Sequence, residues 1–184
     1  MNYYAFSALV NFFTSVFIAG LVFKKTNRKN ITSMTFFLFA LAVSVWSLNY
    51  FVWQISQTKF FAEIFSRFLF LPAIWIPSLF FHFIVTLADK KDYLKKAVIF
   101  NYILSIFFSV LMPFNLFLKG VDVVFDFQFW PKPGPIFPLF LLYFLGVAIA
   151  AHFILWRAII TSLSPKKTTQ LKYVFHFFCN DIPL

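Results

Sequence analysis

Long apolar runs separated by short polar segments make up most of the chain. Five runs are about 20 residues or longer, at 3–23, 32–53, 61–88, 97–118 and 136–160. A helix of about 20 apolar residues crosses the roughly 30 Å hydrocarbon core of a bilayer. The runs do not alternate apolar and polar positions, as the strands of a membrane barrel do. The pattern therefore predicts an all-α fold, a polytopic transmembrane helix bundle with about five full spans.

The end of the chain begins like a sixth span and then changes character. Residues 173–184, YVFHFFCNDIPL, would reach only about 18 Å at helical rise. Asn180, Asp181 and Pro183 interrupt the apolar run before it is long enough to cross. We therefore predict a partial sixth span over 173–184, a single sensor-like domain over 1–184, and a chain that is truncated relative to a longer protein.

One segment between the fourth and fifth runs follows a different period. In VDVVFDFQFWPKPGPIF, Phe125, Phe127 and Phe129 are expected to face away from Asp126 and Gln128, and three prolines follow. Alternation with period two is typical of a strand with two different faces. We predict a single short strand or extended segment on the membrane surface, with Trp130 at headgroup depth, where amphipathic aromatic residues gather.

Composition agrees with a membrane location. The 184 residues are 61% hydrophobic and 24% aromatic, and only 12% are charged. An average soluble domain carries about 25% charged residues. A water-soluble fold of this size cannot bury so much apolar surface, so we predict that the lipid bilayer is the chain's main partner.

The positive charge is concentrated in loops, which predicts the orientation. With the N-terminus outside, the inner loops hold 12 of the 16 Lys/Arg residues and the outer loops hold three, Lys59, Lys119 and Lys132. Cytoplasmic loops carry such an excess of basic residues. We therefore predict a multi-pass protein of the cytoplasmic (inner) membrane with its N-terminus outside. The net charge of +10 does not indicate nucleic-acid binding, because the cations lie between spans and not along one groove.

Four ionisable residues within the runs are the candidates for a ligand-binding site. Glu63 lies one turn before Arg67 near the outer end of the third run, and His82 lies deeper in the same run. One interpretation is an interfacial Glu63–Arg67 pair with Arg67 reaching the headgroups. The other is an outward-facing pocket lined by both residues, because ionisable groups within a membrane often mark a functional site.

His82 and His152 lie at comparable depths in the third and fifth runs, so the two imidazoles could meet. A buried histidine is more often a structural hydrogen-bonding group than a ligand. Two histidines without a carboxylate or a cysteine form a poor metal site, so we predict no metal. Pro72 and Pro77 are expected to kink the helix between Arg67 and His82.

Other polar residues do not indicate catalysis. Each of Asn11, Asn49, Asn101 and Asn115 places one amide within or near a span, and such amides usually bond between helices. Cys179 is the only cysteine. The sequence contains no glycine-rich phosphate loop, paired acidic motif, or nucleophile with a visible base, so we predict no enzymatic activity and no cofactor.

Several segments together resemble the N-terminal seven-transmembrane sensor region of bacterial histidine kinases. They are NFFTSVFIAGLVF, the basic loop KKTNRKN, TFFLFALAVSVWSLNYFVW, PAIWIPSLFFHFIVTLADKK, KPGPIFPLFLLYFLG and PKKTTQLKYV. The resemblance covers nearly the whole chain. It implies a sensory, signal-transducing membrane domain of a two-component system.

Relative to that pattern, we expect the sixth and seventh spans and the kinase module to be missing. The resemblance therefore implies a cytoplasmic kinase or signalling module on another chain as partner, and possibly a homodimer. The alternative is an accessory or structural membrane subunit. A small transporter ranks behind both, because no inverted repeat or midplane convergence of polar residues is evident.

Overall fold

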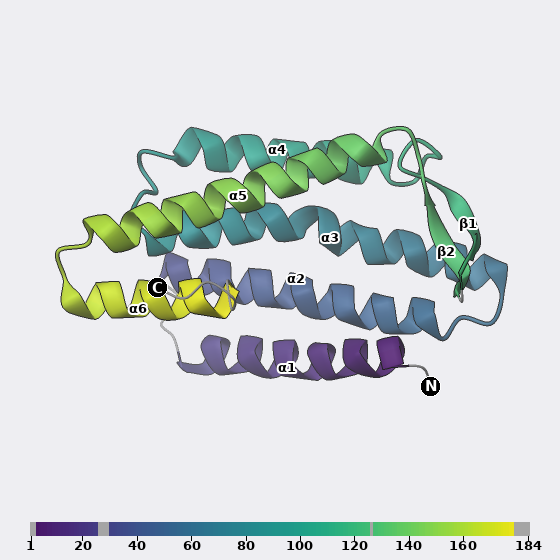
Figure 1. The fold of residues 1–184 in the computed structure, drawn as a ribbon, viewed down its shortest axis with the longest axis horizontal. Coiled ribbons are helices and arrows are strands. Elements are labelled where there is room, and N and C mark those ends of the chain that lie inside the picture. Colours follow the sequence, from purple (N-terminus) through teal and green to yellow (C-terminus); the bar gives the residue numbers. More distant parts are fainter. Residues whose placement is uncertain (1–2, 26–29, 126, 179–184) are drawn as a thin grey trace.

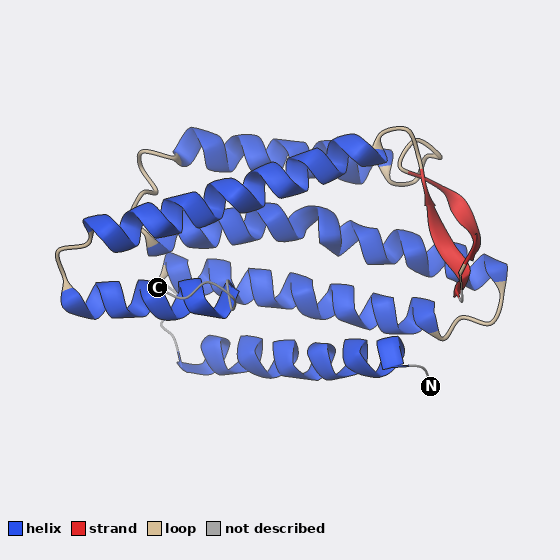
Figure 2. Cartoon of the chain, in the orientation of Figure 1, coloured by secondary structure: helices blue, strands red, loops and turns tan. Residues whose placement is uncertain are grey.

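The structure is a computed structural model that describes residues 3–25, 30–125 and 127–178. Figures 1 and 2 show a helical bundle with one β-hairpin at its end. In chain order the elements are α1 (Tyr3–Lys25), α2 (Ile31–Gln54), α3 (Lys59–Leu87), α4 (Lys95–Leu111), β1 (Leu118–Val124), β2 (Phe127–Pro133), α5 (Phe137–Thr161) and α6 (Pro165–Phe178).

Helix α3 is the centre of the bundle. It packs against α2 on one side and against α4 and α5 on the other, and α1 lies at the edge along α2 (Figure 1). In the most apolar 18-residue stretch of α3, 61% of the residues are buried, whereas in that of α1 only 11% are buried. The apolar side chains of α1 therefore face outward, as expected for a helix in contact with lipid.

The bundle has two distinct ends. At one end, which we call the basic end, lie the last turn of α1, the loop 88–94 between α3 and α4, and the loop 162–164 between α5 and α6 (Figure 1). At the opposite end, which we call the hairpin end, lie the start of α1, the loop 55–58 and the β-hairpin (Figure 1). The predicted alternation of basic and non-basic loops thus corresponds to two ends of one bundle.

Local sequence signals set the helix boundaries. The Asn30 side chain caps α2 by accepting hydrogen bonds from the backbone N–H groups of Thr32 at 3.0 Å and Ser33 at 3.4 Å. The Thr58 hydroxyl caps α3 by accepting from the Phe61 N–H at 3.4 Å. After α3, Asp89 takes a left-handed conformation with φ 54°, which turns the chain away from the helix axis.

Four of the predicted runs form helices that are long and apolar enough to cross a membrane, namely α1, α2, α3 and α5. Their bounds differ from the predicted ones by at most two residues. The prediction of five full spans is not confirmed, because the run 97–118 is not one helix. Helix α4 has 17 residues and ends at Leu111, and Leu118 already belongs to β1. Pro113 explains the stop, since it has no N–H to continue the helical hydrogen bonding.

The predicted partial sixth span, 173–184, overlaps a helix that begins earlier. Helix α6 begins at Pro165, eight residues before the predicted start at 173. Leu171 and Phe175, one turn apart, are buried in the main core cluster beside Leu155. Leu171 and Phe175 thus form an apolar face on α6, which is otherwise rich in polar residues, and this face packs against the core. The predicted residues 179–184 lie outside the residues that the structure describes.

The predicted extended segment forms two antiparallel strands. Gly120 pairs with Lys132, and Asp122 with Trp130. Gly120 has φ 131°, a conformation that favours glycine. Along β2, Phe127 and Phe129 are half-buried while Gln128 is exposed, as predicted, but Phe125, in the turn before β2, is 94% exposed and does not share their face.

The hairpin packs on the end of α2 through aromatic residues. The Trp53 indole N–H donates to the Phe129 carbonyl at 2.9 Å. The centroid of the Trp53 ring lies 6.5 Å from the centroid of the Phe127 ring and 5.6 Å from that of the Trp130 ring. The headgroup depth of Trp130 stays a prediction.

Candidate functional site

Polar side chains of α3 contact other elements at three levels between the two ends. The first level is Arg67, near the hairpin end. One guanidinium nitrogen donates to the Met112 carbonyl at 2.7 Å. The other donates to the Asn115 side-chain oxygen at 3.2 Å and the Leu118 carbonyl at 3.3 Å. Arg67 therefore joins α3 to the C-terminal end of α4 and to the start of β1, where free carbonyls and the helix dipole favour a cation.

Glu63 makes different contacts from those predicted. Its carboxylate lies 3.9 Å from the Lys59 ammonium, one turn away, and is not paired with Arg67 among the described residues. One carboxylate oxygen lies 3.2 Å from the place where a Cβ on Gly120 would stand. Arg67 donates to the carbonyls of Met112 and Leu118 and to the Asn115 side chain, so the predicted Glu63–Arg67 pair is not formed. The reach of Arg67 to the headgroups stays a prediction. The ligand-binding role of the two residues stays a prediction.

The second level is a buried cluster of hydroxyl groups at the middle of α3. The Ser78 hydroxyl lies 2.8 Å from that of Ser105 in α4 and 2.7 Å from that of Tyr143 in α5. It also lies 2.9 Å from the Asn101 carbonyl, to which it donates. Ser78 is 1% exposed and Ser105 is 0% exposed. We call Ser78, Asn101, Ser105 and Tyr143 the hydroxyl cluster; it joins three helices in the interior.

The hydroxyl cluster lies at the proline-containing part of α3. The helix runs through Pro72 and Pro77, although proline has no N–H to bond the preceding turn. The Ser105 hydroxyl also contacts this turn, at 3.1 Å from the Ile74 carbonyl. A neighbouring helix thus supplies a donor to the carbonyl that comes one residue after the Ala73 carbonyl, which Pro77 leaves without a helical donor.

The two histidines do not meet. The His82 ring nitrogen Nδ1 lies 3.0 Å from the Tyr102 hydroxyl of α4. The His152 Nδ1 lies 2.8 Å from the Ala148 carbonyl of its own helix, and the His152 ring packs on Phe80 at 5.5 Å. Phe80 and His82 lie about 200° apart around α3, so the two imidazoles contact different faces of that helix. Their joint site is not formed, and a separate ligand-binding role for each stays a prediction.

The third level lies at the basic end. The Thr86 hydroxyl of α3 lies 3.3 Å from that of Thr35 in α2. Asp89, two residues after α3, accepts a hydrogen bond from the Lys167 ammonium of α6. The end of α3 is therefore tied to both α2 and α6.

The hairpin carries its own exposed ion pair. The Lys132 ammonium donates to the Asp122 carboxylate at 3.1 Å, and the Val123 N–H donates to the other carboxylate oxygen at 3.0 Å. The hydrogen bond from Lys132, followed by that from Val123, lowers the pKa of Asp122. This carboxylate therefore stays charged, and the ion pair links the two strands of the hairpin.

The asparagines behave in three ways. Asn11 bonds between helices, since its amide donates to the Ser47 hydroxyl at 2.7 Å. Asn49 and Asn101 donate to carbonyls of their own helices. Asn115 accepts from Arg67.

Sequence reasoning missed the hydroxyl cluster because it followed ionisable groups and amides. The available signal was serine at apolar helix positions, which often bonds across helices.

Comparison with known proteins agrees with the predicted resemblance. A family model described as the N-terminal 7TM region of histidine kinase matches residues 7–178. Searches for similar curated proteins and similar solved structures gave no match. The match covers nearly all of α1 and every later element, including the hairpin and the three levels of contact on α3. The chain therefore belongs to the family of N-terminal seven-transmembrane regions of histidine kinases.

Proposed function

We propose that this membrane sensory domain works through α3, which passes a change at the hairpin end to the basic end. The observation that supports this most directly is the set of polar contacts of α3 at three levels. They join α3 to α4 and β1 through Arg67, to α4 and α5 through Ser78, and to α6 through Asp89. Helix α2 also has hydrogen bonds to other elements at both ends and between them, through Thr35, Ser47 and Trp53, but their partners lie in α3, α1 and the hairpin.

The first and third levels of contact on α3 are separated by about the thickness of the hydrocarbon core of a bilayer. Arg67 and Asp89 are 22 positions apart, which is about 33 Å along a helix. A ligand or strain that moves the hairpin relative to α4 changes the acceptors of Arg67. The hydroxyl cluster lies beside Pro77, so an exchange of its hydrogen bonds alters the kink of α3. The contact between Asp89 and Lys167 then transfers the change to α6.

The output proposed for this domain is a cytoplasmic kinase or signalling module that responds to α6. We place the partner on another chain, and a homodimer would bring two such modules together. This proposal is supported by the family, whose members are the membrane regions of histidine kinases.

We also propose that α4 is a fifth crossing. It runs beside α3 from the basic end to the hairpin end (Figure 1). Its 17 residues span about 26 Å, slightly less than the usual hydrocarbon thickness, and local thinning of the bilayer accommodates such a difference. With the basic end in the cytoplasm, the N-terminus and the hairpin lie outside the inner membrane.

Cysteine labelling tests this orientation. In a Cys179→Ser background, Lys91→Cys at the basic end is expected to react with an impermeant maleimide only after the membrane is opened. Gln128→Cys on the hairpin is expected to react in intact cells. Labelling of both positions from the same side would contradict the proposed orientation.

Removing the hydroxyl cluster tests the role of α3. The double variant Ser78→Ala with Ser105→Ala is expected to lower the free energy of unfolding by about 1–2 kcal/mol, because interhelical hydrogen bonds in membranes contribute about this much. Hydrogen exchange of the α6 amides is expected to accelerate about fivefold, although α6 contains neither residue.

The matched control for this experiment is Ser44→Ala with Ser66→Ala. Both serines are 1% exposed, and both donate within their own helices. This variant is expected to leave the exchange of α6 unchanged. If the cluster variant leaves α6 unchanged as well, the hydroxyl cluster does not couple α3 to α6.

A further inference from the structure

We propose that the pocket between α5 and the loop 88–94 binds the headgroup and upper acyl chain of one anionic phospholipid. This site lies at the basic end, away from the hydroxyl cluster and from Arg67. The proposal requires only that the chain is embedded in a bilayer, although Asp89, which contacts α6, also lines the pocket.

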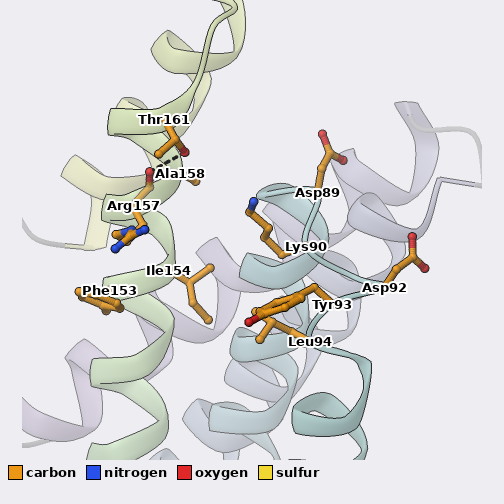
Figure 3. A pocket seen from close by; sticks show the side chains of 10 residues that line it. All are labelled: Asp89, Lys90, Asp92, Tyr93, Leu94, Phe153, Ile154, Arg157, Ala158 and Thr161. Carbon is orange, nitrogen blue, oxygen red and sulfur yellow. Dashed lines mark hydrogen bonds between the residues drawn. The ribbon is translucent and has the colours of Figure 1, made fainter.

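The pocket has a volume of about 520 Å³, within the range of about 300–1,000 Å³ that is usual for small-molecule sites. Helix α5 forms one wall and the loop leading into α4 forms the other (Figure 3). The lining that the argument uses is Lys90, Tyr93 and Leu94 on one wall and Phe153, Ile154 and Arg157 on the other.

The two walls each supply one cation. Lys90 comes from the loop and Arg157 from the last part of α5, and both are exposed. A guanidinium presents several N–H donors to phosphate oxygens, and an ammonium adds a compact charge. Cations from two separate elements around one pocket match a single phosphate group better than a row of cations along one helix.

The acidic residues of the loop do not cancel this charge. Asp89 accepts a hydrogen bond from Lys167 of α6. Asp92 also lines a neighbouring pocket together with Lys91 and Lys95. In Figure 3 the carboxylates of Asp89 and Asp92 point away from α5, whereas the Lys90 ammonium lies on the α5 side of its loop. The side of the pocket next to α5 is therefore positive.

The apolar lining indicates a lipid and not a free phosphate compound. Phe153, Ile154 and Leu94 lie below the cations on the two walls (Figure 3). Phe153 is 55% exposed and Tyr93 is 86% exposed, so these rings are available to acyl chains and to the interface. Basic pockets between helices at the cytoplasmic side of a membrane bind anionic headgroups in this way.

The test is lipid binding by the 184-residue chain in detergent micelles, followed by native mass spectrometry with phosphatidylglycerol and phosphatidylcholine. Wild type is expected to retain phosphatidylglycerol in preference to phosphatidylcholine. Because one cation near a membrane surface contributes about a fivefold attraction, Lys90→Gln with Arg157→Gln is expected to weaken phosphatidylglycerol binding about 30-fold.

The control is Lys24→Gln with Lys25→Gln, which removes two exposed cations from the last turn of α1 at the same end. It is expected to change binding less than about twofold. Equal losses in both double variants, or no loss in the first, would overturn the proposal. Competition by free glycerol phosphate at the same concentration as the lipid would also overturn it, because the occupant would then be a soluble phosphate compound.

Discussion

Replacing Gly134 by alanine is expected to disrupt the junction between the hairpin and α5. A Cβ at this position would lie 2.2 Å from the Leu116 carbonyl oxygen and 2.9 Å from that of Asn115. Both are backbone atoms, so they cannot rotate away. The Gly134 N–H bonds the Phe117 carbonyl at 2.8 Å, and this bond breaks if the backbone shifts. We expect the free energy of unfolding, measured by denaturant titration in micelles, to fall by about 3 kcal/mol or more.

The control for this prediction is Gly146→Ala in the middle of α5. A Cβ at Gly146 meets nothing within 4 Å, and alanine is a better helix former than glycine by about 1 kcal/mol. This variant is expected to be as stable as wild type or more so. If Gly134→Ala and Gly146→Ala unfold alike, the close contact at Leu116 does not exist in the protein.

The second large effect is expected at Arg67. The substitution Arg67→Met keeps a long apolar side chain but leaves the Met112 and Leu118 carbonyls without their donor. Losing hydrogen bonds from a charged group costs about 2–4 kcal/mol of the free energy of unfolding. The segment 112–136 is expected to become sensitive to limited proteolysis, which reports the hairpin directly.

Two further variants sharpen this test. Arg67→Lys is expected to be intermediate, since one ammonium cannot reproduce the fork that contacts both carbonyls. Lys119→Met removes an exposed cation from β1, beside the same contacts, and is expected to behave like wild type. Equal protease sensitivity of Arg67→Met and Lys119→Met would show that Arg67 does not anchor the hairpin.

The helices were predictable because a bilayer imposes a length and a composition on them. The apolar runs of α1, α2, α3 and α5 gave bounds within two residues. The error at α4 arose because hydropathy counts residues 112–118 as apolar. Hydropathy does not report the backbone conformation of these residues. Pro113 stops the helix, and Leu118 pairs with Pro133 in the hairpin.

The candidate site was less predictable, because its contacts depend on which helix faces meet. Depth along a helix placed His82 and His152 at similar levels, but their rings face different neighbours. Helical spacing suggested that Glu63 and Arg67 pair, yet Arg67 donates to Met112, Asn115 and Leu118, which only the packing of α3 against α4 and the hairpin brings within reach. Ser78 and Ser105 are far apart in sequence and become partners only through the packing of α3 and α4.

The coupling of the two ends through α3 is tested most directly by a distance measured at the basic end after a change at the hairpin end. Spin labels at positions 91 and 169, on the loop after α3 and on α6, report this distance in a Cys179→Ser background. Arg67→Met and, to a smaller extent, Arg67→Lys are expected to shift or broaden the distance distribution, whereas Lys119→Met leaves it unchanged. Identical distributions in all of these variants and in wild type would contradict the coupling.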